Sequence, residues 1–174
     1  SNRIARYNPT TGDWTALATG TDGMVRALAV LPGGDLVVGG WFATAGGVAT
    51  NHVARYNPTT EVWSSLGSGT DGPILPSTFL PAGDLVVGGS FTAAGGFAAN
   101  NIARCNPTTG VWSALGNGTN DSVYALTVLP EGDLAAGGNF IQAGGNVSAY
   151  LARYTFGSLA PAISSQPVSA VACH

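Results

Sequence analysis

Residues 4–11 read Ile-Ala-Arg-Tyr-Asn-Pro-Thr-Thr, and nearly the same eight residues return at 53–60 and at 102–109. The spacing is 49 residues each time, and a further copy begins at Leu151. The first two full periods agree at 28 of 49 positions without a gap. Self-similarity at a fixed period of this length is the signature of a repeat protein. The chain is therefore built from duplicated copies of one unit.

Each unit predicts four short strands separated by turn residues. The first is the apolar run 24–31, and the second is 36–40, which ends in a glycine pair. We expect both of these strands to be buried on both faces. A loop at 41–52 leads to the third strand at 53–57, and the fourth lies around 63–66.

Strands that are buried on both faces must be covered on both, and identical units can do this by stacking. Four strands in a period near 50 residues favour radial stacking into a β-propeller over a parallel β-helix, whose repeats are much shorter. We therefore predict an all-β fold, a propeller of four-stranded antiparallel blades with about three blades per chain. The expected blades lie near 24–66, 73–115 and 122–154, with an N-terminal strand pair at 3–17.

The glycine pair and two spaced aromatic residues resemble the kelch repeat. In the first unit these residues are Gly39-Gly40, Tyr56 and Trp63. The resemblance covers residues 3 to about 156 and implies a propeller. It departs from the kelch pattern where Cys105 replaces a tyrosine and where the last unit has no tryptophan after its tyrosine, which leaves that unit's fourth strand in doubt. A further Phe-x-x-Ala-Gly-Gly element is similar to elements of bacterial secreted repeat proteins.

Three blades leave blade faces and strand edges uncovered, which folded proteins avoid. One expectation is a homodimer that completes a ring. The ring would have six blades if the N-terminal strand pair of one chain finished the last blade of the other, and eight if each chain kept its own strand at 151–154. The alternative is that a longer chain closes the ring by itself.

The composition changes after Phe156, where residues 157–174 become rich in Pro and Ser. We interpret this segment as a linker and the start of a possible following domain. It resembles the entry to an immunoglobulin-like domain of the kind that follows propellers in secreted bacterial proteins. That resemblance implies an extracellular or cell-surface location.

Several function classes are disfavoured by composition. Only 9% of residues are charged, lysine is absent and the net charge is −3, so no basic surface for nucleic acid is expected. No apolar run is long enough to span a membrane. The two cysteines lack metal-site spacing, and His52 and His174 are the only histidines. Copper oxidases with kelch-like propellers need several His and Tyr ligands near the axis, and we identify no such set in this sequence. We expect no catalytic, cofactor-binding or metal site.

Two kinds of charged residue recur at the repeat period. The aspartates precede the second strand, and a structural role in the turn is favoured over a ring of metal ligands. The arginines lie in the third strand, and we expect them to pair with these aspartates or with carbonyls of the next blade, with an anion-binding ring as the alternative. Thr-Asp-Gly segments such as 21–23 are expected to join successive blades. The repeated residues are Asp35, Asp84, Asp133, Arg6, Arg55, Arg104 and Arg153.

The tryptophans divide into two groups. Trp14, Trp63 and Trp112 occupy one repeat position, which favours core packing over stacking on sugars. Trp41 differs, because Ser90 and Asn139 stand at the equivalent positions of the other units. It is the candidate ligand-contact residue, since variable loop positions carry recognition more often than the scaffold does.

The functional hypothesis is a non-catalytic binding or scaffold module of a larger secreted protein, which recognises protein or carbohydrate through its loops. One alternative is a fragment of a propeller enzyme, a hydrolase or an oxidase, whose catalytic residues lie elsewhere. Another is a purely structural repeat. His, Asp, Glu or Tyr residues that do not recur in the other units and that cluster at one end of the ring would favour the enzyme.

Overall fold

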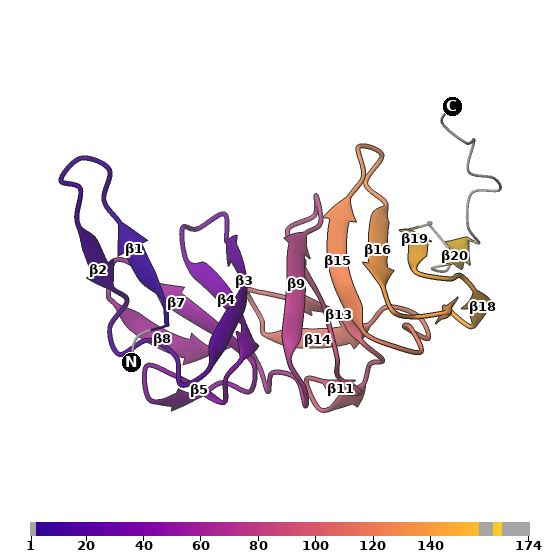
Figure 1. Ribbon diagram of the computed structural model, residues 1–174, viewed down its shortest axis with the longest axis horizontal. Coiled ribbons are helices and arrows are strands. Elements are labelled where there is room, and N and C mark those ends of the chain that lie inside the picture. The colour runs from indigo at the N-terminus through magenta and orange to yellow at the C-terminus, as the bar shows by residue number, and fades with distance from the viewer. Residues whose placement is uncertain (1–2, 157–161, 165–174) are drawn as a thin grey trace.

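In the computed structural model the blades follow one another as an arc, from the N-terminal strand pair at one end to the last blade at the other (Figure 1). The structure describes residues 3–156 and 162–164. All regular elements within these residues are strands, and they form three four-stranded antiparallel sheets with smaller hairpins. The predicted all-β propeller architecture is confirmed. In the described part of the chain, no helix is long and apolar enough to cross a membrane.

Each blade has the same strand order, with the first strand of the unit at one edge and the fourth at the other. The first blade is β3 (Met24–Val30), β4 (Leu36–Trp41), β7 (Val53–Asn57) and β8 (Val62–Ser65). The second is β9 (Ile74–Phe79), β10 (Leu85–Gly89), β13 (Ile102–Asn106) and β14 (Val111–Ala114). The third is β15 (Val123–Val128), β16 (Leu134–Gly138), β19 (Leu151–Thr155) and β20 (Ala162–Ser164).

The N-terminal pair is the outer half of a blade. β1 (Ala5–Tyr7) pairs with β2 (Trp14–Ala16) so that Tyr7 lies opposite Trp14. In the first blade, Tyr56 lies opposite Trp63 in the same register. β1 and β2 are therefore equivalent to the third and fourth strands of a blade.

The turn between these outer strands is fixed by an asparagine. The Asn57 side-chain oxygen accepts hydrogen bonds of 2.9 Å from the backbone N–H groups of Thr59 and Thr60. Asn106 makes the same contacts at 3.0 Å to Thr108 and Thr109. The proline that follows each asparagine cannot donate to a β-ladder, so the strand ends where the sequence predicts.

The segment expected to be a loop between the second and third strands contains a small hairpin in every blade. The three hairpins share two-residue strands and a Gly-Gly tip whose glycines have positive φ angles, a conformation that glycine adopts without steric cost. They are β5 (Thr44–Ala45) with β6 (Val48–Ala49), β11 (Ala93–Ala94) with β12 (Phe97–Ala98), and β17 (Gln142–Ala143) with β18 (Asn146–Val147).

The first strand of each unit lies on the inner side of the arc, where β9 contacts both β3 and β15. The expectation that this strand is buried on both faces is wrong in all three blades, because most residues of β3, β9 and β15 are exposed or only half-buried. These strands lie at the free edge of each sheet, so neighbouring blades cover only part of them. The second strand behaves as predicted in the middle blade, since all of β10 is buried.

The glycine pair lets strands and blades approach closely. A Cβ on Gly88 would lie 2.7 Å from Val123 Cγ1 of the next blade, and one on Gly89 would lie 2.1 Å from the Pro73 carbonyl oxygen. The first glycine therefore faces the next blade, and the second faces the neighbouring inner strand.

The end of the last blade differs from the expectation. Ala162–Ser164, inside the segment interpreted as a linker, forms β20 and pairs with β19 as the fourth strand that the sequence left in doubt. The expected start of a further domain at 165–174, including Cys173 and His174, lies outside the described residues.

Candidate functional site

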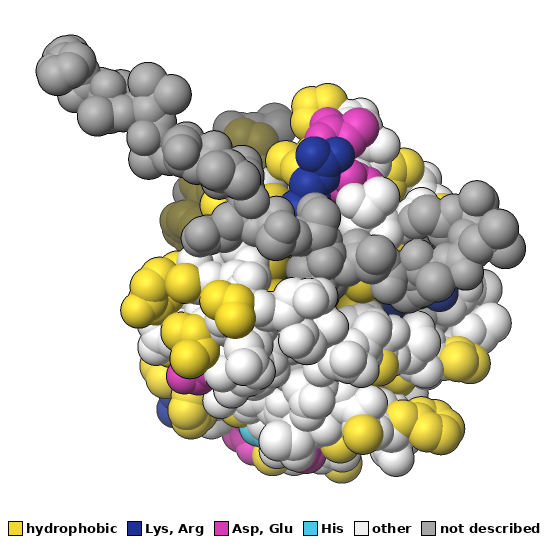
Figure 2. All heavy atoms as spheres, turned by 90° about the vertical axis from the view of Figure 1, so that its right-hand side faces the viewer, with side chains coloured by type: hydrophobic (Ala, Val, Ile, Leu, Met, Phe, Trp, Pro, Cys, Tyr) yellow, Lys and Arg dark blue, Asp and Glu magenta, His cyan; other side chains and the backbone are white. Residues whose placement is uncertain are grey.

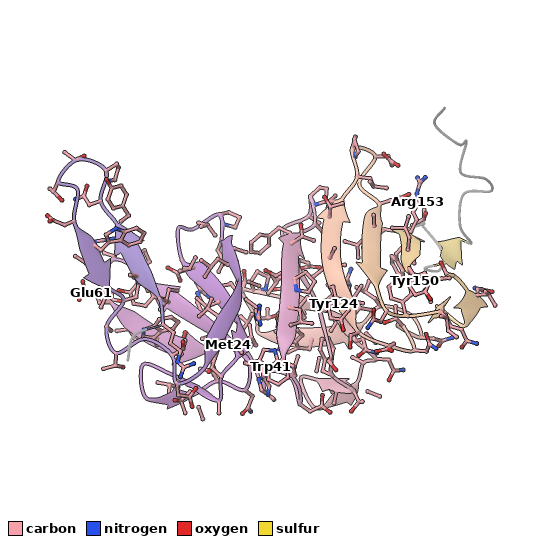
Figure 3. All side chains as sticks on the ribbon, in the orientation of Figure 1. Met24, Trp41, Glu61, Tyr124, Tyr150 and Arg153 are labelled. Carbon is pink, nitrogen blue, oxygen red and sulfur yellow. The ribbon has the colours of Figure 1, made fainter. Side chains whose placement is uncertain are left out.

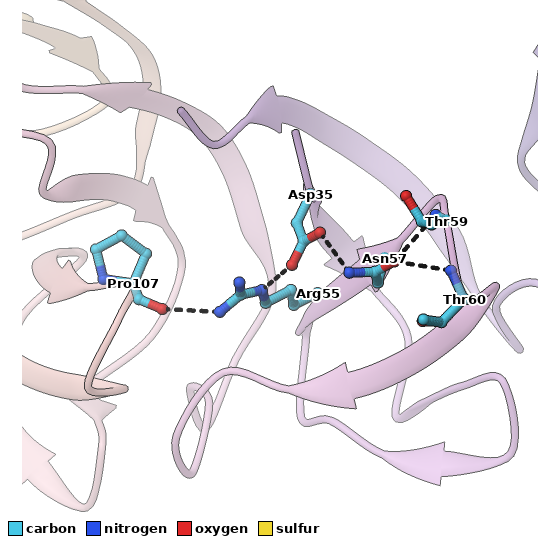
Figure 4. A network of polar contacts seen from close by, with 6 residues as sticks. All are labelled: Asp35, Arg55, Asn57, Thr59, Thr60 and Pro107. Carbon is cyan, nitrogen blue, oxygen red and sulfur yellow. Dashed lines mark hydrogen bonds and ion pairs between the residues drawn. The ribbon is translucent and has the colours of Figure 1, made fainter. Parts of the chain in front are cut away.

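The repeated arginines and aspartates meet within each blade. Arg55 Nε lies 2.5 Å from Asp35 Oδ2, and the Asn57 amide donates to Asp35 Oδ1 at 2.9 Å (Figure 4). Arg55 Nη1 also donates to the Pro107 carbonyl oxygen of the next blade at 3.3 Å. The predicted pairing is confirmed, and the arginine links two blades as well as two strands of its own blade.

The other pairs differ in length. Arg104 Nε lies 3.4 Å from Asp84 Oδ2, whereas Arg153 Nη2 lies 2.5 Å from Asp133 and 3.0 Å from Glu131. The hydrogen bond from Arg153 lowers the pKa of Asp133, and a further bond from Thr155 adds to this. Figure 2 faces this end of the molecule and shows basic and acidic side chains together at its upper margin. Arg6 has no ion pair within the described residues.

Two of the three repeated tryptophans are core residues. Trp63 and Trp112 are each 4% exposed, and their indole N–H groups donate to the carbonyl oxygens of Leu17 and Leu66 in the preceding unit. Trp14 is 69% exposed, so the prediction of core packing is wrong for this residue. The reason is that no earlier blade covers β2 in the described structure.

The Thr-Asp-Gly segments join successive blades and brace the small hairpins. Asp22 Oδ1 accepts backbone hydrogen bonds from Ala43 and Thr44, and Asp71 Oδ1 accepts them from Thr92 and Ala93. The bond from Thr44 is the largest cause of a lowered pKa at Asp22. Burial opposes ionisation of Asp71, but its hydrogen bonds from Thr92 and Ala93 outweigh burial and lower its pKa.

Cys105 fills the position of a tyrosine without creating a reactive site. The thiol is fully buried, and this burial, together with the nearby charge of Asp84, raises its pKa to about 12. A thiol that stays protonated is a poor nucleophile and metal ligand. Within the described residues, no group of three or more His, Cys, Asp or Glu side chains could hold a metal ion.

Trp41 lies at the end of β4, next to the inner side of the arc. It is 51% exposed, and it is paired in register with Met24, which is also exposed (Figure 3). Arg26, which lies two residues after Met24 on β3, is exposed too. In the third blade, the equivalents of Arg26 and Trp41 are Tyr124 and Asn139, and the Asn139 amide donates to the Tyr124 hydroxyl at 3.2 Å.

We name these residues the axial patch: Met24, Arg26, Trp41, Tyr124 and Asn139. The repeats are nearly identical in their second and third strands but differ at these positions, where the second unit has Pro73, Leu75 and Ser90. The sequence pointed only to Trp41. Comparing the three units position by position would also have indicated Arg26 and Tyr124, but their place on the inner strands comes from the fold.

Residues 4–117 match the family described as the Rax2 C-terminal beta propeller domain. The chain belongs to this family. The match covers the N-terminal strand pair and the first two blades of this Rax2-family propeller, and the third blade follows from the repeat. No curated protein matches its sequence.

Solved structures show the same fold at low identity. The extracellular domain of a protein described as a one-component system from B. thetaiotaomicron has a TM-score of 0.62 at 15% identity, with 92% of this chain and 19% of that chain covered. The extracellular domain described as part of a hybrid two-component system from the same organism gives 0.63 at 14% identity, with 98% and 21% covered. A protein described as a gluconolactonase gives 0.57 at 16% identity, with 89% and 53% covered. The Rax2-family propeller thus spans about a fifth of the length of the first two relatives.

Proposed function

We propose that this Rax2-family propeller is a non-catalytic binding module that recognises a partner protein through the axial patch. The observation that carries the proposal is the half-exposed indole of Trp41 beside Met24, at a position where the three repeats carry three different residues. A position that only stabilised the blade would be expected to repeat with the blade, as the Arg and Asp positions do.

The residue types of the axial patch favour a protein partner. Trp, Tyr, Arg and Met are enriched at the centres of protein interfaces, and Trp, Tyr and Arg carry most of the binding free energy there. Trp41, Tyr124, Arg26 and Met24 are these four types. An exposed indole also makes an apolar platform for a sugar ring. Carbohydrate is therefore the other ligand class that the experiment must cover.

Binding rather than catalysis is supported by the use of the carboxylates. Asp35 and Asp133 are held by arginine, and Asp22 and Asp71 accept backbone hydrogen bonds. Each of these groups already has a structural partner, whereas a catalytic carboxylate must be available to substrate.

Three finer assignments belong to the same proposal. The glycine pair and the Tyr56–Trp63 ring contact, with centroids 4.9 Å apart, support a kelch-type repeat. The relatives described as extracellular domains support an extracellular location.

The exposed Trp14 and Leu151 at opposite ends of the arc support a homodimer that completes a ring, and β19 within the chain's own last blade supports the eight-blade version. Light scattering that gives twice the chain mass of 17.4 kDa would support the dimer, and a stable monomer would contradict it.

The test of the binding proposal compares two exposed tryptophans. The chain, a Trp41→Ala variant and a Trp14→Ala variant are each screened against arrays of secreted protein ectodomains and of glycans. We expect a protein ligand whose affinity falls by about 30-fold or more with Trp41→Ala, the range of a central interface residue, and stays unchanged with Trp14→Ala. If ligands sensitive to Trp41→Ala are found only on the glycan array, the ligand of the axial patch is a carbohydrate and not a protein. Protein binding that is insensitive to Trp41→Ala would contradict the proposal.

A further inference from the structure

A polar cleft lies between the second and third blades, at the end of the blades that carries the small hairpins (Figure 1). Its volume is about 420 Å³, within the range of about 300–1,000 Å³ that is usual for small-ligand sites. Both flanking blades have all four strands, so the cleft is a complete feature of the fold. Five carboxamide side chains line this amide cleft, and its other lining residues are threonines and glycines. The five are Asn100, Asn101, Asn117, Asn120 and Gln142.

Three of these amides are held at one end by the backbone. Asn100 Nδ2 donates to the Asn117 carbonyl oxygen at 3.2 Å, and Asn117 Nδ2 donates to the Gly144 carbonyl oxygen at 3.5 Å. Asn120 Oδ1 accepts two backbone N–H groups from the start of the third small hairpin, at 3.0 and 2.8 Å. These bonds orient the amides before a ligand arrives, which lowers the entropic cost of binding.

The other end of each of these amides remains available. Among the described residues, no hydrogen bond engages Oδ1 of Asn100, Oδ1 of Asn117 or Nδ2 of Asn120. The Gln142 amide group has no hydrogen bond in the same part of the chain either. The amide cleft therefore offers free acceptors and free donors, all of them uncharged.

The junction between the first and second blades shows which amides the fold itself needs. Asn51 is the equivalent of Asn100 and makes the same kind of bond, from its Nδ2 to the Ser68 carbonyl oxygen at 3.0 Å. The other equivalents are not amides: Ser68, Asp71 and Ala93 stand at the positions of Asn117, Asn120 and Gln142. Two blades can therefore be joined without these three amides.

The lining selects the class of ligand. A hydroxyl group both donates and accepts, so adjacent hydroxyls on a sugar ring can satisfy the free acceptors and donors together. Peptides and most small molecules are held mainly by apolar and aromatic side chains, whereas this lining consists of amides, hydroxyls and glycines. We propose that the amide cleft binds an uncharged saccharide through Asn117, Asn120 and Gln142. The site is separate from the axial patch and does not depend on the function proposed for it.

The test is a titration of the isotope-labelled full chain, followed by nuclear magnetic resonance. The probes are neutral disaccharides that together contain glucose, galactose, mannose and N-acetylglucosamine. The chain is produced in a host without N-glycosylation, because Asn117 and Asn120 each begin an Asn-x-Ser/Thr sequence and an attached glycan would fill the cleft. We expect a saturable one-to-one titration in which the side-chain amide signals of Asn120 and Gln142 shift.

The variants carry residues that the fold already accepts at the first junction. Asn120→Asp keeps the acceptor of the two backbone bonds, as in Asp71, and removes the free amino donor. Gln142→Ala removes the free amide, as in Ala93. Each change should weaken saccharide binding about three- to tenfold, because one hydrogen bond is lost. The remaining backbone signals should stay in place, which shows that both variants are folded.

Two control variants lie outside the cleft. Ser68→Ala changes an exposed residue at the first junction, and Trp41→Ala changes the axial patch. Both should leave saccharide binding unchanged, so that failure of the axial-patch proposal and failure of this one can be distinguished.

Three outcomes would overturn the inference. The first is the absence of any shift with every disaccharide at millimolar concentration. The second is a shift that Asn120→Asp and Gln142→Ala leave unchanged. The third is tighter binding of glucuronic acid or of a Gly-Ser tetrapeptide than of any neutral saccharide, because the cleft would then select a charged sugar or a peptide.

Discussion

The indole nitrogen of Trp112 donates a 2.9 Å hydrogen bond to the carbonyl oxygen of Leu66, which lies 46 residues earlier in the preceding blade. Trp63 makes the same bond, at 3.1 Å, to Leu17 of the N-terminal strand pair. These bonds connect the outer strands of the first and second blades to the unit that precedes each of them. The stack is therefore held at its outer margin as well as by the apolar contacts between blades.

Replacing Trp112 tests this tie. Trp112→Phe removes the donor, leaves the Leu66 carbonyl without it and opens a small cavity, so we expect the free energy of unfolding to fall by about 1–3 kcal/mol. Trp14→Phe at the equivalent exposed position should change it by less than about 0.5 kcal/mol. Urea denaturation of both variants gives the comparison. Similar losses in the two would mean that Trp14 is covered in solution.

The glycine pair offers a second matched comparison. In Gly88→Ala the new Cβ would lie 2.7 Å from Val123 Cγ1, so the blades must separate, and we expect a loss of about 1–3 kcal/mol in stability. Gly137→Ala, at the equivalent position of the last blade, meets no atom closer than 3.7 Å and should change stability by less than about 0.5 kcal/mol. Thermal unfolding at low protein concentration checks this. A large loss with Gly137→Ala at that concentration would contradict an open last blade.

The Arg–Asp pairs should differ in their contribution to stability. Asp35 is buried, binds Arg55 at 2.5 Å and also accepts from Asn57, so Asp35→Ala should lower the free energy of unfolding by about 1–2 kcal/mol. Asp84 is more exposed and lies 3.4 Å from Arg104, so Asp84→Ala should cost less than about 1 kcal/mol. Chemical denaturation measures both. An equal or larger effect of Asp84→Ala would show that the pair distances do not reflect the energetics.

The lowered pKa of Asp71 predicts an acid-sensitive contact. A carboxyl whose folded pKa lies below its unfolded value of about 3.9 stabilises the fold above that value, and the contribution is lost as pH falls through the folded pKa. Asn120 occupies the same position in the next unit and accepts the same two backbone hydrogen bonds, from Ile141 and Gln142. Asp71→Asn should therefore keep the structure and reduce the loss of stability below about pH 4.

The measurement is urea unfolding of the chain and of Asp71→Asn at several pH values between 6 and 3. The free energy of unfolding of the variant should fall less steeply at the acid end. Identical pH profiles would mean that Asp71 ionises alike in the folded and unfolded chain.

The repeat made much of the fold predictable. Strand positions, turn residues and the partnership of Arg55 with Asp35 all recur at one spacing, so local sequence and periodicity carry the information. The hairpin β5–β6 was missed because two-residue strands have no hydrophobic period to detect. The strand β20 was missed because its segment does not follow the repeat, and its pairing with β19 is a tertiary feature.

The environment of individual side chains was less predictable. Trp14 and Trp63 both follow the same Tyr-Asn-Pro-Thr-Thr segment, yet Trp14 is exposed and Trp63 is buried, because their burial depends on whether a neighbouring blade covers them. The axial patch combines residues from the first and third blades, such as Trp41 and Tyr124, which only the fold places on the same inner side of the arc. Periodicity identifies the residues that recur in every unit, whereas the axial patch consists of residues that differ between units.

The most direct test is a nuclear magnetic resonance spectrum of the chain with its four tryptophans labelled at the indole nitrogen. We expect slow hydrogen exchange at Trp63 and Trp112 and fast exchange at Trp14 and Trp41. When a ligand binds, the Trp41 signal should shift and the Trp14 signal should not. A ligand that shifts Trp14 and leaves Trp41 unchanged would contradict the proposal that recognition takes place at the axial patch.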